Sequence, residues 1–225
     1  LDIETYDYNK NMSTSVSRDV GSLSFSVLTD RYDATVSSYS GGSFKSFSIV
    51  DSGEKQLQYL GGYDDNGIYN DSVSVELLGL GDFNCNPCLQ NLTNSEYINI
   101  PFSVLSPLVV NNQTFNLLGE DSLVVIMEGV WKDKKITKKT TFFGNKYIIR
   151  HQYFLHDNDL DMLRVVWAGG IKTTEKNLSE ELTYSEAFVA QNKTIESVHF
   201  TPSGVSDVAE ELAVIGSTDW VGVRN

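Results

Sequence analysis

The sequence is poor in cysteine and in positive charge, and it has no long apolar run. No stretch approaches the ~20 apolar residues that a membrane span needs, so the 225 residues contain no predicted transmembrane helix. Lys and Arg number 17 against 30 Asp and Glu, giving a net charge of −13. Such an acidic surface is repelled by phosphate backbones and anionic lipids, which argues against nucleic-acid binding. The densest basic stretch, residues 132–139, is predicted to be a solvated hairpin tip.

Motifs of the common catalytic and cofactor-binding sites are also missing. There is no Walker loop, no GxGxxG, no Gly-x-Ser-x-Gly and no HExxH pattern. The acidic segments 64–67 and 157–159 lack EF-hand spacing and are interpreted as exposed turns. We therefore expect no catalytic residue, no cofactor and no metal site.

Aromatic and turn-forming residues are abundant, and the apolar residues alternate with polar ones. Tyr and Phe each occur 11 times, and Leu23, Phe25 and Val27 are separated by serines. A period of two predicts half-buried strands. The fold class expected is all-β: a large two-sheet antiparallel sandwich with at most short helices. We expect one domain over residues 21–225, preceded by a linker or edge segment over residues 1–20.

The middle of the chain predicts an antiparallel meander. Residues 123–131 form an apolar run typical of a strand buried on both faces, and residues 136–143 are the next strand. Gly144-Asn145 is a two-residue hairpin signal, after which Tyr147 and His151 share one face of the following strand. Further strands are expected at 73–77, 162–167, 183–190, 194–200 and 220–223. Residues 205–213 are a weak helix candidate, and 61–94 are interpreted as long loops with one strand.

Cys85 and Cys88 have the spacing of a redox dithiol, but no helix signal follows them. A local disulfide or two idle thiols are therefore the favoured interpretations, and a zinc site would need two more ligands. The histidines lie in no recognisable catalytic frame: His151 is predicted to pack in a strand, and His156 sits in a turn. An acid–base pair of one of the three histidines, His151, His156 or His199, with a distant Glu stays open.

Four segments in order resemble the periplasmic domain of bacterial YidC-type membrane protein insertases. The first is residues 28–47, with Gly41-Gly42 at a chain reversal. The second is residues 136–149, a hairpin with Lys138-Lys139 before aromatics and Tyr147 opening the return strand. The third is residues 167–175, beginning at Trp167, and the fourth is residues 219–225, containing Trp220. The resemblance covers about residues 21–225.

The resemblance implies a β-supersandwich, related in shape to galactose mutarotase, in the periplasm. It implies a multi-pass inner-membrane parent that helps hydrophobic segments enter the bilayer, with nascent membrane proteins and Sec translocon components as partners. The insertase chemistry then belongs to transmembrane segments outside this chain, so the domain itself is a monomeric non-enzyme. We expect one such helix before Leu1. After Asn225 we expect a Tyr-Phe pair, an amphipathic stretch and several helices, one with a buried positive charge.

Two other functions fit an all-β domain of this kind. A mutarotase-like enzyme or lectin needs a cleft with a His/Glu pair or stacking aromatic residues. A surface adhesion or capsid-type domain is the third class.

Overall fold

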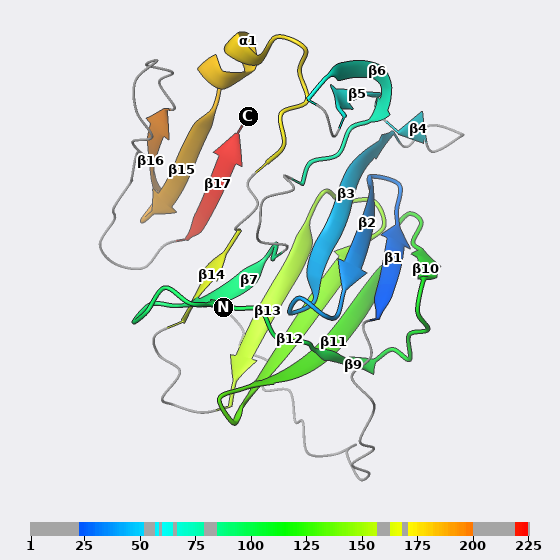
Figure 1. Cartoon of the computed structure of the whole chain (residues 1–225), viewed down its shortest axis with the longest axis vertical. Coiled ribbons are helices and arrows are strands. Elements are labelled where there is room, and N and C mark those ends of the chain that lie inside the picture. The colour runs from blue at the N-terminus through cyan, green and yellow to red at the C-terminus, as the bar shows by residue number, and fades with distance from the viewer. Residues whose placement is uncertain are drawn as a thin grey trace.

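A computed structural model describes residues 23–51, 57–58, 60–64, 67–78, 85–156, 163–167, 171–199 and 219–224. Within these residues the chain forms seventeen strands and one short helix, α1 (Leu178–Thr183). Figure 1 shows two large sheets packed face to face, with smaller sheets around them. The prediction of an all-β sandwich is confirmed. The predicted linker at 1–20 and the helix candidate at 205–213 lie outside the described residues.

The first large sheet has the order β10-β1-β2-β3-β4. Its strands are β1 (Ser24–Leu28), β2 (Tyr32–Ser37), β3 (Ser43–Asp51), β4 (Leu57–Gln58) and β10 (Gln113–Asn116). Strand β10 runs parallel to β1, and the other neighbours are antiparallel. The serine-separated pattern around Phe25 and Val27 does form a strand, and both side chains are buried.

The second large sheet has the order β13-β12-β11-β9 and is antiparallel. Its strands are β9 (Ser103–Ser106), β11 (Ser122–Trp131), β12 (Lys134–Phe143) and β13 (Ile149–Leu155). The prediction that residues 123–131 are buried on both faces is wrong, because Val124 and Val130 face solvent while Val125 and Met127 face the core. The two-residue hairpin after β12 is also wrong: five residues, 144–148, separate β12 from β13.

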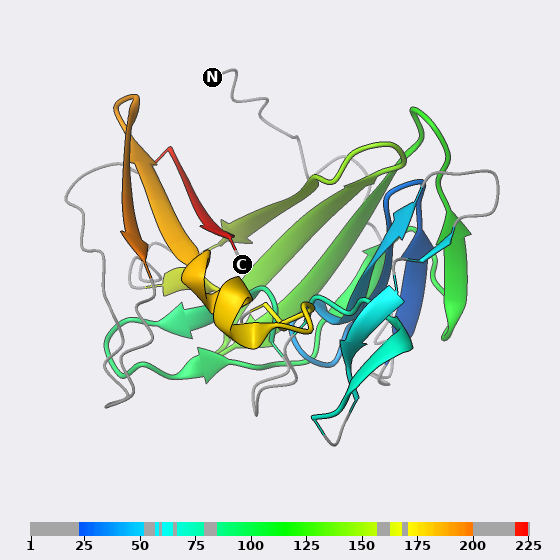
Figure 2. The same ribbon diagram turned by 90° about the horizontal axis from the view of Figure 1, so that it is seen from above.

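The core fills the space between these two sheets. Tyr32 and its neighbours from β1–β3 pack against the inner side chains of β11–β13. Figure 2 shows the ribbons of the two sheets from above. The fully buried apolar side chains include Phe25, Val27, Tyr32, Ala34, Val36, Val125, Met127, Ile136 and Phe142. Alternation along each strand therefore gives one buried face per sheet, which is the sandwich arrangement.

Three small sheets surround the sandwich. They are β14-β7-β8, made of β7 (Cys88–Asn91), β8 (Tyr97–Ile98) and β14 (Leu163–Val166); β16-β15-β17, made of β15 (Glu186–Gln191), β16 (Thr194–His199) and β17 (Trp220–Arg224); and the pair β5 (Leu60–Tyr63) and β6 (Tyr69–Ser74). Residues 61–94 therefore contain most of three strands, not one. Strand β14 pairs with β7 instead of continuing the meander from β13.

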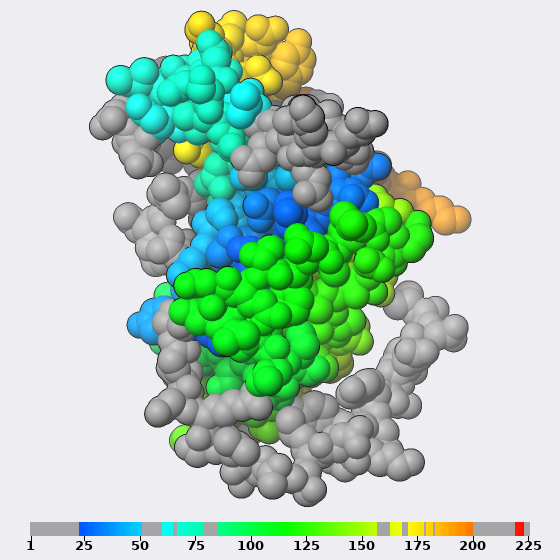
Figure 3. All heavy atoms as spheres, turned by 90° about the vertical axis from the view of Figure 1, so that its right-hand side faces the viewer, coloured from blue at the N-terminus to red at the C-terminus, as the bar shows by residue number. Residues whose placement is uncertain are grey.

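Polar contacts hold the outer elements in place. Asn177 caps α1 by accepting from the amide of Glu180 (3.4 Å), and acidic residues in the first turn suit the helix dipole. Tyr63 fastens the β5–β6 hairpin to the chain before α1 by donating to the carbonyl of Glu175 (3.2 Å). Figure 3 views the molecule from the side on which β10 lies. The β5–β6 hairpin forms the upper end of this view, above the residues of β1 and β2. No helix in the described residues is long and apolar enough to cross a membrane.

Candidate functional site

A lysine lies in the middle of the sandwich core. Lys138 on β12 is in phase with Ile136 and Phe142, and its exposed fraction is 0%. The prediction that residues 132–139 form a solvated hairpin tip is therefore wrong for this residue: the tip is the turn at residues 132–133. The alternation of Lys138 with inward-facing apolar residues was visible in the sequence. Burial of a charge, however, needs polar partners that only the fold supplies.

Three backbone carbonyls surround the ammonium of Lys138. Its Nζ donates to Gly42 at 2.8 Å, to Gly41 at 3.3 Å and, at the limit of a hydrogen bond, to Pro87 at 3.5 Å. The ring of Tyr153 on β13 lies 5.3 Å from the same nitrogen, a cation–π distance. An ammonium has three N–H donors, so these three carbonyls match its protonated form.

The Gly41-Gly42 reversal between β2 and β3 brings two of those carbonyls to the lysine. Gly41 and Gly42 have φ of +64° and +66°, the region that favours glycine. A Cβ at Gly42 would lie 2.6 Å from Cε of Met127. The sequence interpretation of this pair as a reversal that requires glycine is therefore confirmed.

The Cys85–Cys88 turn supplies the third carbonyl and two thiols. Cys85 and Cys88 are 1% and 2% exposed, and both are free thiols in this structure. Oγ of Ser43 on β3 lies 3.7 Å from Sγ of Cys85. No helix follows: Cys88 opens strand β7. The predicted disulfide stays a prediction.

The turn is held from both large sheets. The carbonyl of Pro87 lies within hydrogen-bonding distance of the Ser43 hydroxyl (3.3 Å) and the Tyr153 hydroxyl (3.4 Å), besides Lys138. The amide of Phe44 donates to the carbonyl of Asn86 at 2.8 Å. We call Lys138, Cys85, Cys88, Ser43 and Tyr153 the lysine–dithiol cluster.

The electrostatics of the lysine–dithiol cluster couple its members. The hydrogen bond from Cys88, and further the positive charge of Lys138, lower the pKa of Cys85, whereas the same bond and burial raise the pKa of Cys88. Burial lowers the pKa of Lys138 to about 7. Negative charge on the sulfur of Cys85 or Cys88 acts in the opposite direction and raises this pKa. Burial also raises the pKa of Tyr153. One thiol of the pair is thus the favoured site for a negative charge.

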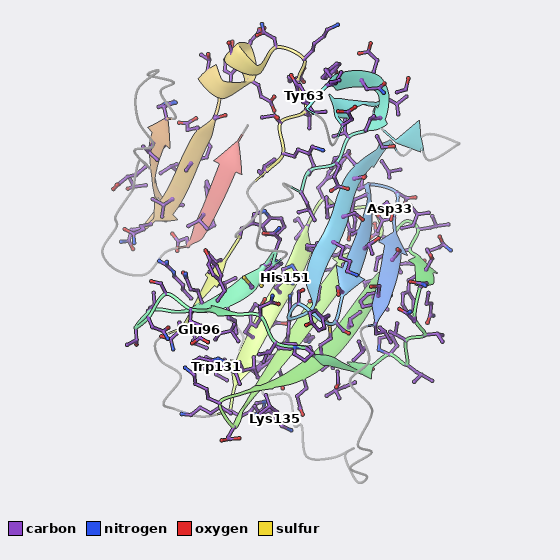
Figure 4. All side chains as sticks on the ribbon, in the orientation of Figure 1. Asp33, Tyr63, Glu96, Trp131, Lys135 and His151 are labelled. Carbon is purple, nitrogen blue, oxygen red and sulfur yellow. The ribbon has the colours of Figure 1, made fainter. Side chains whose placement is uncertain are left out.

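The three histidines have structural partners. His151, labelled on β13 in Figure 4, lies with Nδ1 3.1 Å from Oγ1 of Thr140, and burial lowers its pKa to about 3. This confirms its predicted packing in a strand. His156 lies 2.9 Å from the hydroxyl of Thr137. His199 forms a His–Glu pair with Glu186, with Nε2 3.2 Å from Oε1, across β15 and β16.

The remaining residues singled out from the sequence are dispersed. Tyr147 is 58% exposed in the loop before β13, so its predicted place in that strand is wrong; its ring lies 5.4 Å from the guanidinium of Arg31. Trp167 lies against Phe44, with ring centroids 6.1 Å apart. Trp220 begins β17 and pairs with Ala190. The acidic segment 157–159, and residues 65–66 of the acidic segment 64–67, lie outside the described residues.

In the described part of the chain, no three His, Cys, Asp or Glu side chains come together in a way that could hold a metal ion. The chain matches no protein-family model, and comparisons with curated proteins and with solved structures give no match.

Proposed function

We propose that this chain is the extracytoplasmic, non-catalytic domain of a YidC-type membrane protein insertase. In this proposal it serves a multi-pass inner-membrane protein as an interaction module, on the periplasmic side and near the Sec translocon. The parent protein assists the insertion and folding of inner-membrane proteins through its transmembrane part.

The observation that carries the proposal is that three of the four insertase-like segments meet in one place. Lys138, from the second segment, binds the carbonyls of Gly41 and Gly42 in the first. Phe44, also in the first segment, contacts Trp167 at the start of the third. Residues separated by roughly a hundred positions in sequence thus form one contact network, as expected if the resemblance reflects a shared fold.

The fourth segment supports the proposal in a different way. Trp220 is 48% exposed and lies on β17, in the small sheet that lies away from β10 across the sandwich (Figures 1 and 2). Aromatic residues with a polar edge are common where a protein meets the membrane interface. In the proposed parent protein this strand leads toward the bilayer.

The gene around this segment tests the proposal. We expect a hydrophobic helix encoded before Leu1 and several after Asn225. The full-length protein should fractionate with the inner membrane, and protease should cut this segment in spheroplasts but not in intact cells. A gene without flanking hydrophobic segments, or a segment protected in spheroplasts, would overturn the insertase proposal and leave the β-sandwich unaffected.

One observation favours a mutarotase-like domain as second candidate: the His–Glu pair of His199 and Glu186. Its histidine is 64% exposed, and such a pair can transfer protons. Polarimetry with galactose and glucose decides between the candidates. The insertase proposal predicts no acceleration of mutarotation by the chain. Acceleration that is lost in His199→Gln and retained in His156→Gln would establish the second candidate instead.

A further inference from the structure

The ammonium of Lys138 has no carboxylate partner among the described residues. The ion pairs found there join other residues, and the anionic groups that raise the pKa of Lys138 are the thiols of Cys85 and Cys88. A buried charge without a counter-charge is strongly destabilising. The three carbonyls supply dipoles that suit the ammonium, but they supply no negative charge.

Cys85 is the residue best placed to supply that charge. The turn that carries Cys85 lies against the ammonium, with the Pro87 carbonyl 3.5 Å from Nζ of Lys138, and the Ser43 hydroxyl lies 3.7 Å from the Cys85 sulfur. Positive charge beside a thiol favours the thiolate, and the thiolate is the nucleophilic form. Tyr153, a member of the lysine–dithiol cluster, and His151, two residues before it on β13, both favour their neutral forms because they are buried.

We propose that Cys85 and Cys88 are a reversible dithiol–disulfide site whose reduced form contains a Cys85 thiolate paired with the Lys138 ammonium. The reacting partner is a low-molecular-weight disulfide. Lys138 is a positioning residue, because it stabilises the thiolate without forming a bond to the reacting sulfurs. This site is independent of the insertase proposal.

The exchange balances without any other reactant. The Cys85 thiolate attacks one sulfur of the small disulfide, whose S–S bond breaks and releases one thiolate. Cys88 then loses its proton to that released thiolate and attacks the Cys85 sulfur, which expels the second half of the small disulfide. The protein dithiol is oxidised by two electrons, and the small disulfide is reduced to one thiol, which carries the Cys88 proton, and one thiolate. Because both sulfurs are buried, the exchange requires opening of the turn, so an equilibrium measurement is the suitable test.

The experiment uses the full chain equilibrated in buffers of reduced and oxidised glutathione, then acid-quenched, alkylated and analysed by mass spectrometry. We expect an intramolecular Cys85–Cys88 disulfide that glutathione reduces fully. In Lys138→Met the reduced form loses its counter-charge, so the equilibrium constant for oxidation should rise by about tenfold. Lys139→Met, the neighbour on the opposite face of β12, should match the wild type.

Thiolate absorption in the ultraviolet separates this role from a purely structural one. The reduced chain at neutral pH should show a thiolate signal that Cys85→Ser removes, Cys88→Ser retains and Lys138→Met weakens. Circular dichroism verifies that each variant folds. If Lys138→Met does not fold, the two Cys variants still test whether Cys85 is the thiolate. Absence of the signal in the wild type, its loss in Cys88→Ser alone, or an unchanged oxidation equilibrium in folded Lys138→Met would overturn the proposal.

Discussion

The side chain of Lys138 donates a 2.8 Å hydrogen bond to the carbonyl of Gly42. The lysine belongs to β12 in one large sheet, and the glycine lies in the reversal between β2 and β3 in the other. A charged group therefore links the two sheets where an apolar side chain would ordinarily pack. The link explains why the reversal, the Cys85–Cys88 turn and β13 converge on one point.

Removal of this link should be costly. Lys138→Ala leaves a cavity and removes the donor from three buried carbonyls, so we expect a loss of about 3 kcal/mol or more in the free energy of unfolding. Lys139→Ala, on the outer face of the same strand, should change it by about 0.5 kcal/mol or less. Urea unfolding followed by fluorescence measures both. Equal effects would show that the buried contacts of Lys138 contribute nothing.

The hydroxyl of Tyr32 bonds twice to the backbone of Phe143. It donates to the carbonyl and accepts from the amide, both at 3.3 Å. Tyr32→Phe should lower the free energy of unfolding by about 1–2 kcal/mol, because both backbone groups lose their buried partner. Tyr147→Phe is the matched control, since Tyr147 is exposed and Phe retains the ring that faces Arg31. Equal unfolding midpoints for the two variants would contradict this prediction.

His151 should make the stability depend on pH in the acid range. Burial, and secondarily the charge of Lys138, lower its folded-state pKa to about 3, below the ordinary value of 6.5. The unfolded chain therefore binds a proton first, so stability is full above pH 6.5 and falls toward pH 3. The slope attributable to His151 is up to about 1.4 kcal/mol per pH unit.

His151→Gln should flatten this slope while its amide can still bond Thr140. Urea titrations of both proteins across the acid range give the comparison, and His199→Gln serves as the exposed control. Parallel stability curves for the wild type and His151→Gln would show that His151 does not carry the effect.

The carboxylate of Glu181 in α1 holds the chain that precedes the helix. Its two oxygens accept from the amides of Thr174 (3.0 Å) and Glu175 (3.1 Å), and the side chain is buried. Glu181→Gln replaces one acceptor by a donor, so exchange at one of these amides should accelerate by about tenfold or more. Hydrogen exchange by NMR measures it. Glu180→Gln, on the exposed side, should leave both rates unchanged, and the same result in Glu181→Gln would refute this role.

The sequence by itself determined the fold class and the meander of β11, β12 and β13. Alternation of period two is a local property, so it identified β1 and the inward side chains of Phe25 and Val27 directly from neighbouring residues. The Gly41-Gly42 reversal was equally local, because a positive φ is a requirement of the residue itself.

Only the tertiary structure decided which distant segments meet. The pairing of β14 with β7 and the parallel pairing of β1 with β10 join strands far apart in sequence, and a period of two carries no information about partners. The same holds for Lys138. The sequence showed that Lys138 lies on the same side of β12 as the inward-facing apolar residues, but its charge predicted exposure to solvent. In the fold, three carbonyls and a dithiol surround it. Burial of a charge depends on groups brought from elsewhere in the chain, and so the lysine–dithiol cluster is a product of topology.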